Sequence, residues 1–485
     1  MHNAKNARLM KTAVPIEARL QWLRRFRDAI ARHHVDLAQL AQQEIGKSEF
    51  DAMTADIMPL IASCNWHLRN ARSLLRPRRV GGGGLFGLGH RVDRHRMAIG
   101  RVLIIATWNY PVQLVGIQLV QAVMAGNAVV VKPSERAPRT QGLLMRLAIE
   151  AAQALEPLGV AIEVRSASRE EGRRVLAEEK FDHVVFTGST EVGRAIAEVC
   201  AQRLIASTLE LTGCDSAIVL GDADARAAAR AVFMGFTANA GQTCMAPRRA
   251  LVMREAIAAF TDELRRLLAG APSATLVDEA AAAHSHDVAQ RAIAAGGRSI
   301  MGTLEPRAGR VLRPVVVLDC PLESELFYGK HFGPVLAVRA VESIDEAFEL
   351  HGRIGKYLAT SIWTKRPSEE LAMRAQACAS SLVHFNAVIL PSAHPAVSIS
   401  GHGASGWGCT RGEAGLLALT REVCVTRTSR FIEVPVQEPS PTVQRIVSRL
   451  ICWSPRAAPS SHAAPSPQAD ASHNDMSLQP TKAHL

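Results

Sequence analysis

Residues 102–131 read VLIIATWNYPVQLVGIQLVQAVMAGNAVVV, and this stretch decides the fold. Short apolar runs stand at its two ends, at 102–106 and 128–131, and a helix-length segment at 112–124 separates them. Apolar runs without polar alternation are typical of strands buried on both faces, and such strands pair in parallel when a helix connects them. The stretch therefore predicts a β-α-β unit of a parallel sheet.

The same pattern continues along the chain. A second α/β stretch follows at about 211–385, and residues 14–75 have helical spacing of apolar positions without any strand-like run. Further strands are expected at 160–164, 183–186, 249–253 and 315–318. The predicted fold class is α/β, with parallel sheets covered by helices, an architecture typical of nucleotide-binding proteins.

Composition narrows the class of protein. The chain has 485 residues, 48% of them hydrophobic, which is enough for two or three domains. Its nine cysteines are scattered without any CxxC pair, which argues against a disulfide framework and a zinc site, and we expect no metal. No apolar run reaches the roughly 18 residues that span a bilayer, and the first forty residues show no secretory leader. These features favour a soluble protein in the cytoplasm.

The formal net charge of +11 raises the question of nucleic acid. The basic residues are spread along the whole chain, few aromatic residues lie between them, and no zinc-finger or helix-turn-helix spacing occurs. We therefore interpret the charge as a generally basic surface and expect no nucleic-acid partner.

A glycine-containing turn, FTGSTEVG at 186–193, follows a predicted strand and opens a predicted helix. It does not match a P-loop, because Arg194 and Ala195 stand where lysine and serine or threonine are required. Backbone N–H groups at such a helix start still suit a pyrophosphate. The ordinary alternative is that the glycines serve only the geometry of the turn.

Seven motifs, read in chain order, resemble the signatures of the aldehyde dehydrogenase superfamily, most closely its class 3 and fatty-aldehyde branch. The resemblance covers about 15–430. The motifs are ATWNYP at 106–111, AGN at 125–127, VKPSE at 131–135, FTGS at 186–189, LELTG at 209–213, GQTC at 241–244 and FGPV at 332–335. The resemblance implies a Rossmann-like cofactor domain at 1–75 and 102–210, a catalytic domain at 211–390, a bridging or oligomerisation part at 76–101 and 391–433, and a tail at 434–485.

The resemblance implies three catalytic residues. Cys244 would attack an aldehyde carbon to form a thiohemiacetal and then a thioester, since a thiol is an intrinsically good nucleophile. The side-chain amide of Asn109 and the backbone N–H of Cys244 would hold the oxyanion. Glu210 would activate the water that hydrolyses the thioester. Each residue also has a plain structural reading, as a buried thiol, a turn residue and a surface carboxylate.

The resemblance also implies how a dinucleotide is held. Lys132 and Glu135 would contact the adenine ribose, and a carboxylate there repels a 2′-phosphate, so NAD is favoured while NADP stays an alternative. Tyr110 and Asn386 would lie on the substrate side. The remaining cofactor-side positions are Thr107, Trp108, Ser134, Gly188, Ser189, Gly193 and Phe332.

The sequence departs from the family pattern at four places. Lys330 stands where the family has a glutamate that holds the nicotinamide ribose, and lysine can only donate hydrogen bonds. We expect Lys330 to weaken cofactor binding. The alternative is that Lys330 turns outward and Glu323 or Glu325 takes its place. The other departures are Thr212, Cys214 and the SISG run at 398–401.

The tail contains a basic amphipathic segment at about 442–453, followed by a Pro-, Ser- and Ala-rich stretch that we expect to be disordered. The segment predicts a helix that docks on its own domain or on a dimer partner, or makes a weak contact with a membrane surface. The leading hypothesis is an NAD-dependent dehydrogenase of hydrophobic aldehydes that acts as a homodimer. The alternative is a family member with weakened cofactor binding that serves as a binding protein or thioesterase.

Overall fold

The computed structural model describes residues 14–81, 89–153, 160–429 and 440–452. The chain divides into two compact units, one at 1–82 and 92–426 and the other at 83–91 and 427–485. The Pro-, Ser- and Ala-rich stretch expected to be disordered lies outside the described residues.

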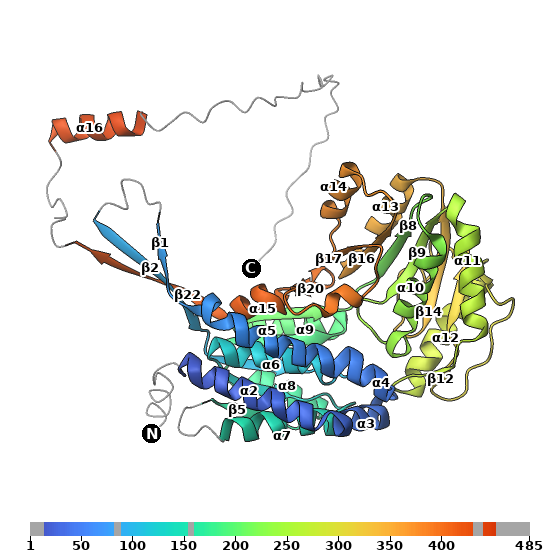
Figure 1. Cartoon of the computed structure of the whole chain (residues 1–485), viewed down its shortest axis with the longest axis horizontal. Coiled ribbons are helices and arrows are strands. Elements are labelled where there is room, and N and C mark those ends of the chain that lie inside the picture. Colours follow the sequence, from blue (N-terminus) through green and yellow to red (C-terminus); the bar gives the residue numbers. More distant parts are fainter. Residues whose placement is uncertain (1–13, 82–88, 154–159, 430–439, 453–485) are drawn as a thin grey trace, which may run out of the picture. The chain divides into compact units, whose positions relative to one another are not determined.

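The stretch quoted above forms the centre of a six-stranded sheet in the first unit (Figure 1). Its strand order is β20-β7-β6-β3-β4-β5, and all neighbours pair in parallel except β20. The strands are β3 (Arg101–Ile105), β4 (Ala128–Lys132), β5 (Ile162–Val164), β6 (His183–Gly188), β7 (Ala206–Leu211) and β20 (Gly406–Trp407). The β-α-β prediction is confirmed. Strand order reverses between β3 and β6, and ligands of such sheets bind at the carboxyl ends of strands beside this point.

Helices cover both faces of this sheet. The crossover helices are α6 (Gln113–Ala125), α7 (Pro138–Gln153), α8 (Arg169–Glu178) and α9 (Thr190–Gln202). Every residue of α6 is buried, because an outer helical layer packs on it and on α7 (Figure 1). That layer consists of α2 (Ile16–Arg32), α3 (His34–Ile45), α4 (Glu49–Ala52), η2 (Met53–Ile57) and α5 (Met58–Leu75). The predicted opening helical layer is thus confirmed.

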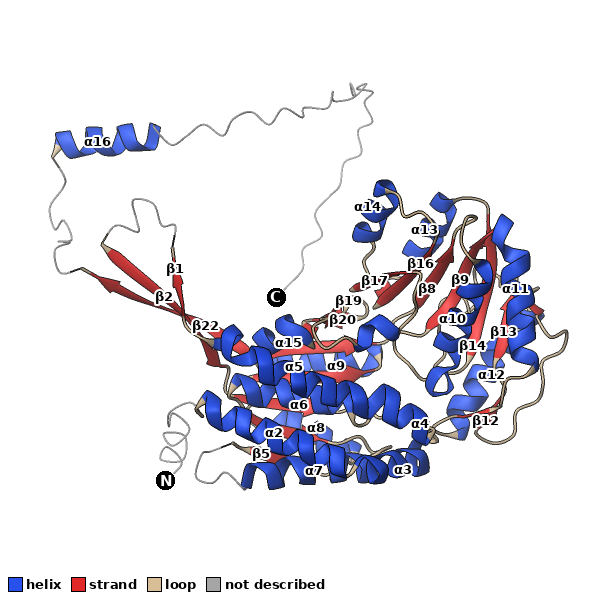
Figure 2. Ribbon diagram, viewed as in Figure 1, coloured by secondary structure: helices blue, strands red, loops and turns tan. Residues whose placement is uncertain are grey.

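A second sheet of seven strands has the order β11-β13-β14-β9-β8-β16-β17, parallel except for β11. Figure 2 shows its strands between helices. One apolar core lies under α10 and α11, and another under α12, α13 and α14. The strands are β8 (Asp215–Val219), β9 (Pro247–Met253), β11 (Arg298–Ser299), β13 (Val315–Leu318), β14 (Val335–Val341), β16 (Ala359–Trp363) and β17 (Leu382–Phe385). The helices are α10 (Ala225–Thr237), α11 (Arg254–Ala269), α12 (Glu279–Ala294), α13 (Ile344–Gly352) and α14 (Glu369–Ala377).

The chain passes from the first sheet to the second within three residues, because β7 ends at Leu211 and β8 begins at Asp215. The carboxyl end of β7 therefore adjoins the amino ends of β8 and its parallel neighbour β9. Glu210 lies at that end of β7, and Cys244 precedes β9 by three residues. The short connection brings these two residues into one neighbourhood.

A three-stranded sheet joins β1 (Arg78–Val80), β2 (His90–Ala98) and β22 (Thr420–Thr428), and α15 (Gly412–Ala418) precedes β22. β1 and β2 pair in antiparallel register, with Arg78 opposite Arg94. The second unit contains α16 (Pro441–Cys452). Within the described ranges, no helix has the length and apolar character needed to cross a membrane.

Candidate active site

The loop that carries Cys244 has an unusual backbone. Asn239, Ala240 and Gly241, in the short helix η4 (Ala238–Gly241), all have positive φ angles, of 52°, 56° and 71°. A Cβ atom on Gly241 would lie 2.3 Å from the carbonyl carbon of Gly333, so no larger residue fits there. The left-handed run turns the chain sharply from α10 toward β9 and presents Cys244 at the junction of the two sheets.

Arg248 holds this loop in place. Its guanidinium donates to the carbonyl oxygens of Gly241 at 2.9 Å, Thr243 at 2.7 Å and Gly333 at 3.2 Å. The side chain is fully buried, and burial lowers the pKa of Arg248 to about 10. It also lies over the ring of Phe332, 5.3 Å from the ring centroid. Arg248 therefore ties the Cys244 loop to the Phe-Gly-Pro segment.

Asn109 approaches the same loop from the carboxyl end of β3. Its side-chain Nδ2 donates to the carbonyl oxygen of Gln242 at 3.0 Å, and its own carbonyl accepts from Asn239 Nδ2 at 2.8 Å. The neighbouring Tyr110 hydroxyl is 2.7 Å from Thr243 Oγ1. The structure thus brings Asn109 and Tyr110 beside the residues that precede Cys244.

Glu210 is buried, and its two carboxylate oxygens differ. Oε2 accepts a 3.0 Å hydrogen bond from Thr410 Oγ1, whereas Oε1 is buried without a partner among the described residues. The Glu210 charge raises the pKa of the Cys244 thiol, so the two groups interact electrostatically. An oxygen without a partner can accept a proton or orient a water molecule.

The surroundings keep the Cys244 thiol neutral. Burial is the largest cause and the Glu210 carboxylate the next, and together with Asp215 they raise its pKa to about 12, while Arg411 and Arg248 act in the opposite direction. A thiol with this pKa carries little thiolate at neutral pH and depends on a base when it reacts. Glu210 is the carboxylate best placed for that task.

The other side of Cys244 is apolar. The thiol packs against a small cluster formed by Met245, Leu358, Ala359 and Ile399. Ile399 belongs to the SISG run that departs from the family pattern, so this run supplies an aliphatic side chain to the cluster. Buried apolar side chains therefore lie next to the Cys244 thiol.

The segment predicted to hold a cofactor lies at the carboxyl ends of β4 and β6. Lys132 Nζ is 3.5 Å from Glu135, and Arg169, in the first turn of α8, donates to Glu135 Oε1 at 2.7 Å. Burial lowers the pKa of Lys132, and the hydrogen bond from Arg169 lowers that of Glu135 against the effect of its own partial burial. Arg169 was not foreseen, and it places a cation next to the carboxylate expected to contact ribose.

Two glycines and a serine shape the start of α9. Ser189 caps the helix, because its Oγ accepts from Val192 N at 3.3 Å. A Cβ on Gly193 would lie 2.4 Å from a methyl carbon of Leu211, so glycine lets α9 pack directly on β7. Gly188 ends β6 immediately before the cap. The turn thus places a helix N-terminus at the carboxyl edge of the sheet.

Ordered polar and aromatic contacts connect the remaining cofactor-side positions. The buried Gln141 accepts from Ser134 N at 2.6 Å and donates to the Thr107 carbonyl at 2.7 Å. Trp108 and Phe332 meet edge to face, with ring centroids 5.8 Å apart. These contacts join β3, β4 and the Phe-Gly-Pro segment around one edge of the first sheet.

The Lys330 side chain is 60% exposed, and its Nζ lies 3.8 Å from Glu325. A lysine ammonium avoids burial when it can remain in water. That Lys330 weakens cofactor binding stays a prediction. Glu325 is also paired with Arg291 at 2.6 Å, so the carboxylate considered as a substitute is already engaged.

Asn386 lies on the exposed end of β17, where its side-chain amide bonds the backbone of Thr364 in both directions, at 3.0 Å and 2.9 Å. These bonds hold the chain after β16 and β17, so the observed role of Asn386 is to fix backbone. Thr212, another departure, has its carbonyl bonded by Ser405 Oγ at 3.0 Å, and Cys214 is fully buried.

Comparison with known proteins decides the family. The family model described as "Aldehyde dehydrogenase family" matches residues 1–425. The chain belongs to the aldehyde dehydrogenase family. The resemblance found in the sequence and the α/β fold are confirmed, and the chain is an NAD(P)-dependent aldehyde dehydrogenase.

Individual relatives support this assignment. The chain is 29% identical to aldehyde dehydrogenase family 3 member B2 of Mus musculus, over 85% of each protein. It is 32% identical to benzaldehyde dehydrogenase [NAD(+)] of Pseudomonas putida, over 71% of each. A solved structure, succinic semialdehyde dehydrogenase from Streptococcus pyogenes in complex with NADP+, superposes with a TM-score of 0.78 at 22% identity and covers 85% of this chain and 90% of that one. The structural likeness concerns the fold alone.

Several residues of this aldehyde dehydrogenase site were not predicted from sequence. They are Gln141, Arg169, Arg248, Thr410 and Arg411. A signal existed for Arg248, because it closely follows the cysteine within an apolar strand. Thr410 lies 200 residues from Glu210 along the chain, and no local pattern announces that contact.

Proposed function

We propose that this aldehyde dehydrogenase oxidises hydrophobic aldehydes to carboxylic acids with Cys244 as nucleophile, Glu210 as general base and Asn109 as oxyanion donor. One observation supports this most: the Asn109 amide, the half-free Glu210 carboxylate and an apolar cluster all surround the Cys244 loop.

The first step follows from the pKa of the thiol. As Cys244 Sγ bonds to the aldehyde carbon, its proton passes to Glu210, and the carbonyl π electrons move to oxygen. The resulting oxyanion receives hydrogen bonds from Asn109 Nδ2 and from the backbone N–H of Cys244, and one such donor is worth about 3 kcal/mol. A bound NAD(P)+ would supply the acceptor for the hydride of the thiohemiacetal carbon, and loss of that hydride would leave a thioester on Cys244.

Glu210 completes the cycle. Its carboxylate, after losing the first proton to solvent, takes a proton from water as the water oxygen bonds to the thioester carbon. The C–S bond then breaks, the acid departs and Cys244 regains a proton. The Thr410 hydroxyl holds Glu210 Oε2, which leaves Oε1 to face the water.

The described residues fit a dinucleotide. The capped start of α9 offers backbone N–H groups to a pyrophosphate, and Gly193 allows α9 to pack closely on β7. Glu135 and Lys132 would bind the adenine ribose, and Thr107, Trp108, Ser134 and Phe332 would line the remaining cofactor side.

The test is Cys244→Ala with NAD, NADP and a series of aldehydes of increasing chain length. We expect NADH or NADPH formation to fall by at least about 10³-fold, since the covalent intermediate cannot form. Cys320→Ala, which removes another buried thiol, should retain activity. Full activity in Cys244→Ala would contradict the mechanism, and NAD titrated against tryptophan fluorescence separates a failed mechanism from failed cofactor binding.

We also propose that the enzyme is a cytoplasmic homodimer and that α16 contacts either the partner or a membrane surface. Five large apolar side chains of α16 are between 43% and 71% exposed, and Arg445 and Arg449 lie on the same helix. Light scattering measures the mass in solution, and flotation with anionic vesicles tests the membrane contact. A monomer that ignores vesicles would contradict both proposals.

A further inference from the structure

A cavity of about 150 Å³ lies outside the catalytic site, between the β1–β2 hairpin and α15. Two leucines and one glutamate complete its wall, but most of its polar lining is arginine. The lining residues are Leu74, Arg76, Arg78, Arg94, Arg96, Glu413 and Leu417. All of them belong to the same compact unit.

The strand register explains why the arginines gather. Arg78 on β1 lies directly opposite Arg94 on β2. Alternate residues of a strand share a face, so Arg96, two positions from Arg94 on β2, extends the same face. Arg76, the residue that follows α5, also lines the cavity. Four guanidinium groups therefore project toward one cavity.

This arrangement is unfavourable without a counter-ion. Like charges directly opposite each other on two strands destabilise the pairing. Glu422 lies 3.0 Å from Arg96 and 3.9 Å from Arg94, and Glu413 lines the cavity, so two carboxylates face four guanidinium groups. On the other face of the same hairpin, Arg79 lies opposite Asp93, a complementary pair. The lining of the cavity therefore carries an excess of positive charge.

We propose that this cavity binds a phosphate group. Guanidinium forks match the geometry of phosphate oxygens and form paired, charge-assisted hydrogen bonds with them. The volume is below the 300 Å³ or so at which pockets begin to hold drug-sized ligands, so a phosphate group enters while a nucleotide does not. The phosphate is either a free ion or the exposed group of a larger molecule such as an anionic lipid.

The first experiment measures thermal unfolding of the full chain in inorganic phosphate, with ionic strength held constant by chloride. We expect a saturable rise in Tm. Arg78→Gln and Arg94→Gln should each weaken the phosphate dependence by about tenfold or more. Arg79→Gln, on the opposite face of the same strand, is the matched control and should leave it unchanged. Arg169→Gln should also leave it unchanged, which separates this cavity from the cofactor segment.

A charge reversal gives the sharper test. Arg94→Glu places a carboxylate opposite Arg78, so the hairpin should become stable without phosphate and lose its response to it. Vesicles of phosphatidylcholine with and without phosphatidic acid then distinguish the two sources of phosphate. Vesicle binding that requires both phosphatidic acid and Arg78 identifies a lipid headgroup. A phosphate effect on Tm without vesicle binding identifies a free ion.

Three results would overturn the proposal. The first is no saturable phosphate effect in the unmodified protein. The second is an equal effect in Arg78→Gln, Arg94→Glu and the unmodified protein. The third is a change in solution mass in Arg78→Gln without any phosphate effect, which would show that the arginines serve an interface between copies of the chain.

Discussion

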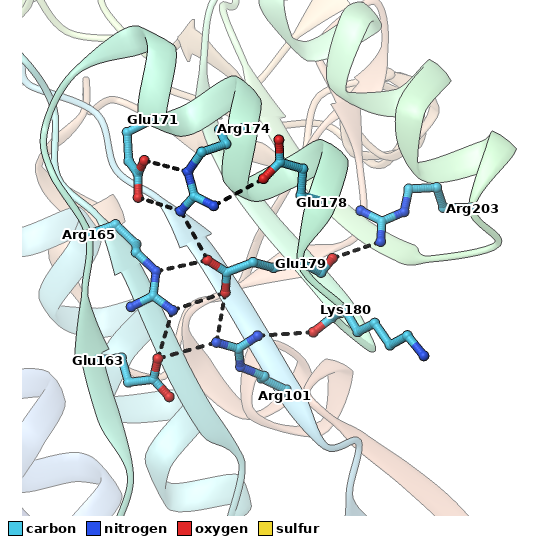
Figure 3. Close-up of polar contacts among 9 residues, drawn as sticks. All are labelled: Arg101, Glu163, Arg165, Glu171, Arg174, Glu178, Glu179, Lys180 and Arg203. Carbon is cyan, nitrogen blue, oxygen red and sulfur yellow. Dashed lines mark hydrogen bonds and ion pairs between the residues drawn. The ribbon is translucent and has the colours of Figure 1, made fainter. Parts of the chain in front are cut away.

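Two groups of charged side chains in this chain contrast in their hydrogen bonding. In the first, at the β5 edge of the six-stranded sheet, the carboxylates of Glu163, Glu171 and Glu179 each contact arginine (Figure 3). The Glu179 carboxylate pairs with two arginines, Arg165 at 2.9 Å and Arg101 at 2.9 Å. This charge network is closed and satisfied.

The second group surrounds Cys244, and its polar atoms are left short of partners. Within the described part of the chain, Glu210 Oε1, Asp215 Oδ2, Arg248 Nε and Arg411 Nε are all buried without a hydrogen-bond partner. Burial also raises the pKa of Asp215 to about 7. Native proteins rarely leave such atoms unpaired, so these atoms support the proposal that this neighbourhood binds substrate and cofactor.

The largest expected effect comes from Glu210→Gln, which removes the base from the unsatisfied group. Turnover of aldehyde should fall by about 10² to 10⁴-fold, the usual contribution of a general base. The same change removes the negative charge that raises the pKa of Cys244. At pH 8, well below the pKa of the thiol, a lower pKa means a larger thiolate fraction. Alkylation of Cys244 by iodoacetamide at pH 8 should therefore become faster, by up to about tenfold.

In Glu210→Gln, turnover should therefore fall while the alkylation rate of Cys244 rises. Steady-state kinetics measures the first, and the rate of iodoacetamide alkylation measures the second. In the unmodified enzyme the alkylation rate should keep rising with pH to beyond about pH 10, because the folded pKa is near 12. If alkylation and turnover both fell in the variant, the electrostatic account of Cys244 would be wrong. Glu171→Gln, in the satisfied group, is the control.

A smaller effect on activity is expected at Glu135. Its carboxylate pairs with Lys132 and Arg169, as in the network around Glu179, but it is also open to a ligand, as in the group around Cys244. Glu135→Gln removes the charge that repels a 2′-phosphate and leaves Lys132 and Arg169 in place. The ratio of kcat/KM for NADP to that for NAD should rise by about tenfold, which equals 1.4 kcal/mol.

The companion variant Arg169→Gln should move the ratio in the opposite direction, because it removes a cation from the same position. Both variants are measured with one aldehyde at saturating concentration. An unchanged ratio in both would show that this segment does not select the cofactor.

The smallest effect concerns stability in the closed network. Hydrogen bonds from Arg165 and Arg101 lower the pKa of Glu179 from 4.5 to about 2. A carboxylate with a lowered folded pKa stabilises the protein fully above its ordinary pKa, and this stability is lost as pH falls from 4.5 toward 2. Glu179→Gln should lower the free energy of unfolding by about 1 to 2 kcal/mol at pH 7, after allowance for solvent screening.

Urea denaturation over a range of pH checks this, with Glu178→Gln, whose side chain is 64% exposed, as the control. The difference between Glu179→Gln and the unmodified protein should shrink as the solution becomes acidic. A difference that stayed constant with pH would point to packing instead of charge.

Much of the architecture could be predicted from sequence. The runs at 102–106 and 128–131 became β3 and β4 because uninterrupted apolar strands have no stable place outside a covered sheet. Cys244 was found through the order of several motifs, each of which is weak alone. Predictions from sequence were confirmed for strands and helices whose burial follows from the apolar residues of the segment itself.

Other features depend on contacts between distant segments. The partner of Glu210 is Thr410, and Arg169 reaches Glu135 across 34 positions of the chain. A motif gives the identity of Lys330 but not its partner Glu325, which lies 3.8 Å from Lys330 Nζ. Such contacts exist only after the sheets have formed, so residue patterns along one segment do not reveal them.

The pairing of β20 with β7 also has a consequence for how the protein is made. Gly406 lies opposite Glu210 in this antiparallel pair, and Thr410 follows four residues later. On the ribosome, the chain through β17 leaves β7 as an open sheet edge, which is a template for pairing with other chains. The proposed base Glu210 therefore gains its Thr410 partner only after β20 has been made, and a chain that terminates before residue 406 should aggregate as well as lack activity.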